Sequence, residues 1–85
     1  MTSEQVQQLD TLNRNGWSWV LISNLTPGII RIRLAVDNDM MAGKSIEGDS
    51  FENALLKARS FVDSTDPAEF TVSFYDALSA DLDLP

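Results

Sequence analysis

Apolar and polar residues alternate most regularly between positions 29 and 36. Isoleucine, leucine and valine occupy the even positions from 30 to 36, and Arg31 and Arg33 lie between them. Successive side chains of an extended chain point to opposite faces, so this pattern predicts a β-strand with one apolar face and one basic face.

The segment before this strand predicts its partner. Residues 17–23 are aromatic and β-branched, which is typical of strands. A turn is expected at 24–28, because it contains a proline and a glycine. The two strands should therefore form an antiparallel hairpin. After a loop at 37–43, residues 44–47 can add a short third strand.

Apolar residues recur at helical spacing in two other segments. In residues 50–63 they form a continuous stripe, and Asp49 with Glu52 has the spacing of a capping box. Residues 3–14 predict an N-terminal helix whose apolar residues fall close to one side.

The C-terminal segment has two interpretations. Its start at 66–69, Asp-Pro-Ala-Glu, favours a helix, whereas the apolar residues at positions 70, 72 and 74 alternate as in a strand. We favour a short helix over 67–78 and keep a fourth strand as the alternative. Residues 79–85 are expected to be a frayed acidic tail.

These elements predict one small α+β domain spanning residues 1–85. A two- or three-stranded antiparallel sheet packs against the 50–63 helix, and the two ends pack around that unit. Apolar residues make up 44% of the chain and charged residues 22%, which is a globular rather than a disordered balance. A sheet this small leaves free edges, so a homodimer through a strand or the open face is a reasonable expectation.

The register of the hairpin decides the position of the two tryptophans. One register places Trp17 and Trp19 in the core, and we favour it because large apolar side chains are costly to expose. A slip of one residue places them beside Arg31 and Arg33 on the open face. That aromatic–arginine patch could bind a peptide, a partner protein or, less readily in an acidic chain, single-stranded nucleic acid.

The net charge of −7 is concentrated at the C-terminal end. Residues 63–85 contain six acidic residues, including Asp76, Asp81 and Asp83, and no basic residue. The simplest interpretation is a solvated, solubilising end. The alternative is an acidic surface that docks on a basic partner or imitates nucleic-acid phosphates.

The composition argues against catalysis. The chain has no cysteine and no histidine, so it lacks thiolate chemistry, the commonest general base and the commonest transition-metal ligand. We therefore predict no catalytic, cofactor-binding or metal-binding residues. Met40, Met41 and Leu56 are further candidates for an interface, although such residues more often cover a core or stand alone on a surface.

No apolar run is long enough to span a bilayer, and the polar first ten residues do not resemble a signal peptide. These features predict a cytoplasmic protein.

The order of motifs resembles a known group. Gly16-Trp17-Ser18-Trp19 in a strand, and Gly48-Asp49-Ser50 followed by Ala54-Leu55, are similar to small phage-type α/β/α sandwich proteins of unknown function. The resemblance covers about residues 3–60 and implies a fold and a phage or prophage origin, but no catalytic residue.

We expect a non-enzymatic protein–protein interaction module. The alternatives are an acidic inhibitor that blocks a basic nucleic-acid enzyme and a direct binder of single-stranded nucleic acid.

Overall fold

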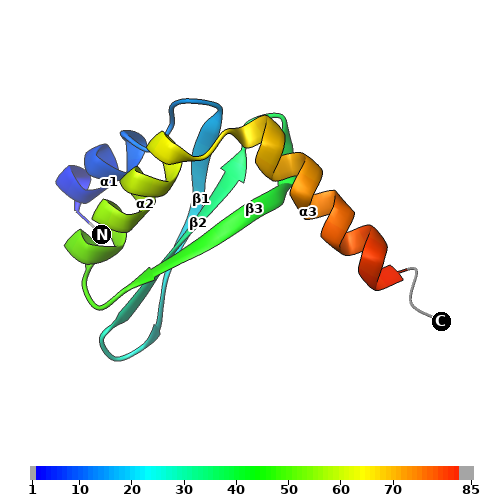
Figure 1. Cartoon of the computed structure of the whole chain (residues 1–85). Coiled ribbons are helices and arrows are strands. Elements are labelled where there is room, and N and C mark those ends of the chain that lie inside the picture. The colour runs from blue at the N-terminus through cyan, green and yellow to red at the C-terminus, as the bar shows by residue number, and fades with distance from the viewer. Residues whose placement is uncertain (1, 83–85) are drawn as a thin grey trace.

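The computed structural model describes residues 2–82, which form three helices and a three-stranded antiparallel sheet (Figure 1). The elements are α1 (Ser3–Asp10), β1 (Trp17–Thr26), β2 (Ile29–Val36), β3 (Asp39–Gly48), α2 (Phe51–Ser64) and α3 (Pro67–Leu82). The strands lie in the order β1-β2-β3, so β1 and β3 are both edges of the sheet. This is the α+β class that the sequence predicted.

The hydrophobic core lies between the sheet and the helices α1 and α2, which cover one face (Figure 1). α3 continues this helical layer for its first turns and then extends away from the sheet. The fully buried core side chains come from α1 and the turn after it, all three strands and α2: Leu9, Leu12, Trp17, Ile32, Leu34, Ala42, Ala54, Ala58 and Val62. Across residues 2–82, no helix has the length and apolar character needed to cross a membrane.

The hairpin adopts neither of the two simple registers. Trp19 pairs with Leu34, but the next aligned pair is Leu21 with Arg33, so Val20 is an extra residue in β1. Such a bulge reverses the alternation of side chains beyond it. The register of the first half of β1 is therefore the one favoured above. In the second half Ile22 pairs with Ile32, which is the pairing of neither register, although Ile22 faces the core as in the alternative.

Both tryptophans lie on the core side of the sheet, as we favoured. Trp17 is fully buried, and Trp19 is half-buried against the core. The opposite face carries Arg31 and Arg33, so the aromatic–arginine patch considered above does not form. The bulge instead places Leu21 beside Arg33 on that open face, where its side chain is 59% exposed.

The third strand is longer than predicted. A loop was expected at 37–43, but only Asp37 and Asn38 form the turn, and β3 begins at Asp39. The register shifts between Ala35 and Val36, which leaves residues 40–42 without direct partners on β2. This irregularity hid the alternation of the strand from sequence analysis.

The ends of α1 and α2 differ in detail from the prediction. α1 begins at a capping box of Thr2 and Gln5 and ends at Asp10, four residues earlier than expected. α2 has Ser50 as its cap, because the Ser50 hydroxyl accepts a hydrogen bond from the Asn53 backbone amide. The predicted pair of Asp49 and Glu52 does not make this cap.

The C-terminal segment is a helix, and it is longer than the predicted 67–78. Asp66 caps it by accepting a hydrogen bond from the Ala68 amide, and Pro67 occupies its first position. The helix continues to Leu82, so the part of the expected frayed tail from 79 to 82 is helical; residues 83–85 lie outside the described residues.

The start of α3 rests on the turn before β1. Gly16 has a φ of +83°, and a Cβ atom there would lie 2.7 Å from Cγ of Pro67. The side-chain amide of Asn15 donates to the carbonyl of Val62, near the end of α2. Glycine at position 16 thus permits both the left-handed turn and the close approach of α3.

Candidate interaction surface

Trp17 joins three elements at the base of α3. Its ring makes edge-to-face contacts with Phe61 of α2 and Phe70 of α3, at centroid distances of 4.9 and 5.1 Å. Its indole Nε1 donates a hydrogen bond of 3.0 Å to the carbonyl of Thr65, which lies between the two helices. This cluster fixes the position at which α3 leaves the core.

A row of aromatic side chains leads from this cluster to the surface. Phe70 stacks on Phe74 at 6.3 Å, and Phe74 contacts Tyr75 edge to face at 5.3 Å. The Tyr75 hydroxyl donates a hydrogen bond of 2.5 Å to Oδ2 of Asp39 on β3. This side-chain contact ties the middle of α3 to the first residue of β3.

The hydrogen bond perturbs both titrating groups. The Tyr75 hydroxyl stabilises the ionised Asp39, so the pKa of that carboxyl lies below its ordinary value of 3.8. The same bond raises the pKa of Tyr75 above its ordinary value of 10.0. The backbone amide of Met41 also donates to Asp39, at 3.0 Å. Asp39 is therefore an anchored carboxylate.

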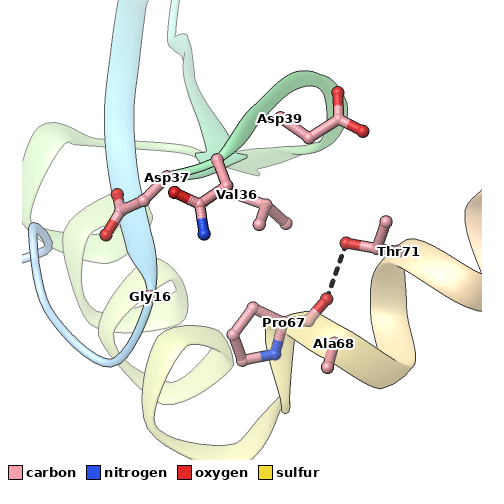
Figure 2. A pocket seen from close by; sticks show the side chains of 8 residues that line it. Gly16, Val36, Asp37, Asp39, Pro67, Ala68 and Thr71 are labelled. Carbon is pink, nitrogen blue, oxygen red and sulfur yellow. Dashed lines mark hydrogen bonds between the residues drawn. The ribbon is translucent and has the colours of Figure 1, made fainter.

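A depression of about 540 Å³ lies between the β2–β3 turn and the start of α3 (Figure 2). Several of its polar groups are paired within the fold: the Ser18 hydroxyl donates to Asp37, and Thr71 donates to the carbonyl of Pro67 at 2.7 Å. The Asp37 and Asp39 carboxylates point in different directions in Figure 2. The described residues contain no group of three or more acidic side chains that could hold a metal ion. The side chains of Asp37, Asp39 and Thr71 that line the depression are thus engaged in hydrogen bonds within the fold.

The outer surface of α3 carries three exposed apolar side chains, Val72, Tyr75 and Leu78, which we call the α3 strip. Their exposed fractions are 62%, 40% and 40%. Side chains three residues apart are neighbours on a helix, so the strip is continuous. It runs along α3 from the part that contacts β3 through Tyr75 toward the end of the helix that extends away from the sheet (Figure 1).

Acidic side chains border the α3 strip. Glu69 and Asp76 are exposed and lie seven residues apart, which places them on one side of the helix. No lysine or arginine follows Arg59 in the sequence, so α3 has no basic side chain of its own. The strip is thus an apolar surface with a negative margin.

Two predicted residues lie at the start of β3. Met40 and Met41 are 61% and 70% exposed, and they directly follow Asp39, the hydrogen-bond partner of Tyr75. Asp76 borders the α3 strip, whereas the side chain of Asp81 and the whole of Asp83 lie outside the described residues.

Leu56 lies elsewhere. It is 62% exposed on the outer side of α2, in a shallow depression with Gln8, Glu52 and Arg59. The structure therefore separates it from the methionines and from Asp76.

Sequence analysis missed the three residues of the α3 strip. Val72 belongs to an alternating apolar pattern that also fits a strand. In a strand its three-residue spacing with Tyr75 and Leu78 has no structural meaning. In a helix, the same spacing places the three side chains next to one another on one surface.

Comparison of the chain with protein-family models, curated proteins and solved structures finds no match. The resemblance to small phage-type proteins therefore stays a prediction.

Proposed function

We propose that this protein is a non-enzymatic protein–protein interaction module that binds through the α3 strip. The observation that carries the proposal is the exposure of Val72, Tyr75 and Leu78 on a helix that extends beyond its own sheet. Fully burying one large apolar side chain contributes about 1.5–3 kcal/mol, so covering these partly exposed side chains is favourable.

The chemistry of the strip specifies a partner surface. An amphipathic helix binds other proteins by laying its apolar side into a hydrophobic groove. Glu69 and Asp76 border the strip, and α3 carries no basic residue. The complementary surface is therefore an apolar groove with lysine or arginine at its margin.

The other surfaces support a role in binding rather than catalysis. The side chains of Asp37, Asp39 and Thr71 in the depression beside α3 are held in hydrogen bonds within the fold, and the chain has neither histidine nor cysteine. The exposed apolar side chains of α3 are therefore the feature that most favours binding of another protein.

Capture of partners with paired variants tests this proposal. Leu78→Asp places a charge within the strip, and Leu56→Asp places the same charge on an equally helical, exposed site on α2. We expect the wild type and Leu56→Asp to retain the same partner from a lysate of the source cells, whereas Leu78→Asp loses it about ten-fold or more, as for a residue at the centre of an interface.

Unchanged retention by Leu78→Asp would contradict the proposal. The same experiment separates the acidic-inhibitor alternative. A partner that is released by moderate salt and by Asp76→Asn, but not by Leu78→Asp, would bind the negative charges rather than the apolar strip.

A further inference from the structure

The face of the sheet opposite α1 and α2 is not covered by any element of residues 2–82 (Figure 1). The bulge in β1 turns Val20 and Leu21 toward this open face, and their side chains are 41% and 59% exposed. Arg31 and Arg33 of β2 lie beside them. The open face is therefore apolar at β1 and basic at β2.

The two arginines of the open face have spare hydrogen-bonding capacity. Arg31 meets Glu47 of β3 at 3.6 Å, which is longer than a well-formed ionic hydrogen bond. Its Nε is buried and has no hydrogen-bond partner. Arg33 forms no ion pair within residues 2–82, and its guanidinium lies over Gly43. Because Nε of Arg31 is buried, the donors that an incoming carboxylate would meet are the terminal guanidinium nitrogens of Arg31 and Arg33.

This face matches the partner surface that the α3 strip requires. The strip is apolar with an acidic margin of Glu69 and Asp76. The open face has its exposed apolar side chains on the edge strand β1, beside Arg31 and Arg33 on the central strand β2. Glu47 of β3 offsets part of the charge of Arg31, and Arg33 has no such ion pair within residues 2–82. Both surfaces belong to the same chain, but α3 extends away from its own open face (Figure 1).

We propose that α3 of one molecule binds the open sheet face of a second copy, and that the contact is made twice around a two-fold axis. The proposal rests on the function proposed for the α3 strip and names its partner. A specific interface buries about 1,200–2,000 Å² in total, and two reciprocal contacts approach that size where one helix would not.

Other symmetric arrangements are less favourable. Direct packing of α3 against α3 would bring two sets of Glu69 and Asp76 together, and like charges in contact are repulsive. Pairing through strand edges is opposed by irregular backbone, because register shifts interrupt β1 at two places and β3 near its start. Reciprocal binding of α3 to the open sheet face avoids both problems.

The test is sedimentation velocity of the full chain over a wide concentration range. We expect the wild type to form a dimer, and Leu21→Asp on the open face and Leu78→Asp on α3 each to raise its dissociation constant about ten-fold or more. Leu56→Asp is the matched control and should dimerise as the wild type does. Far-ultraviolet circular dichroism and the emission of the buried tryptophan report whether each variant is folded.

Mixing the two defective variants identifies the geometry. A dimer of Leu21→Asp with Leu78→Asp keeps one intact contact of α3 on an open face, so the mixture should associate more strongly than either variant alone. Dimerisation that is lost with Leu78→Asp but unaffected by Leu21→Asp would overturn the proposal in favour of α3 against α3. A wild type that stays monomeric would also overturn it. The function proposed above would still stand if Leu78→Asp then lost a different captured protein.

Discussion

At the scale of single residues, the contact between Tyr75 and Asp39 links the middle of α3 to the start of β3. The Tyr75 hydroxyl donates to Asp39 at 2.5 Å, which lowers the pKa of the aspartate and raises the pKa of the tyrosine. A lowered carboxyl pKa gives stability that is lost as the pH falls through the folded value, below 3.8. A raised tyrosine pKa gives stability that is lost as the pH rises through the folded value, above 10.0.

The tyrosine half of this account can be measured directly, because Tyr75 is the only tyrosine in the chain. Titration of its absorbance near 295 nm should give a midpoint above 10.0 for the wild type. Asp39→Asn removes the negative charge and should lower that midpoint toward 10.0. Equal midpoints for the two proteins would show that the hydrogen bond does not form in solution.

The environment of some residues could be predicted from the sequence, whereas that of others could not. The burial of Trp17 follows from the cost of exposing a large apolar side chain. The bond from Tyr75 to Asp39 joins residues 36 positions apart, and no local pattern announces it. Contacts of this kind depend on the angle at which α3 leaves the core, which is set by packing around Trp17.

At the scale of elements, α3 carries apolar side chains both on the side that packs against the core and on an exposed side. Phe70 and Phe74 are four residues apart and pack against the core, whereas Val72 lies between them and is 62% exposed. In a strand, Phe70, Val72 and Phe74 would all face the same side. The apolar alternation here reflects two different surfaces of one helix, one for the core and one exposed.

A pair of alanine substitutions distinguishes these arrangements. Phe70→Ala removes ring contacts with Trp17 and Phe61 and should lower the free energy of unfolding by about 2–4 kcal/mol. Val72→Ala should change it by no more than about 0.5 kcal/mol, because the side chain is exposed and alanine is the better helix former. Urea denaturation measures both. Comparable large losses for the two variants would indicate that Val72 is buried as in a strand.

The elements with regular patterns were predicted most accurately. β2 has the predicted bounds of 29–36, and α2 lies within one residue of the predicted 50–63 at each end. β3 and the second half of β1 were not predicted in register, because bulges break the two-residue period from which strand faces are inferred. The bulges therefore account for most of the differences between the predicted and the observed strands.

At the scale of the whole molecule, the projecting helix makes the protein elongated. The principal extents are 46, 28 and 18 Å, and the Cα radius of gyration is 13.9 Å. A compact domain of this length would have a radius of gyration of about 12 Å. The excess extension comes from α3, which extends away from the sheet (Figure 1).

The distribution of charge is also a property of the whole molecule. The acidic C-terminal segment was evident from the sequence, and the fold places part of it on α3 beside an apolar strip. Which side chains of β1 lie beside Arg31 and Arg33 was not evident, because it depended on the bulge at Val20. The apolar side chains next to the two arginines of the open face thus emerge only from the folded chain.

Site-specific photo-crosslinking tests the central claim, that another molecule covers the α3 strip, most directly. Benzoylphenylalanine would replace Val72 in one variant and Leu56 in the other; both positions are helical and 62% exposed. Irradiation of intact cells should give a covalent adduct from position 72 and none from position 56. An adduct of twice the chain mass would identify a second copy, and another mass a different partner. No adduct from position 72, or equal adducts from both positions, would contradict the account.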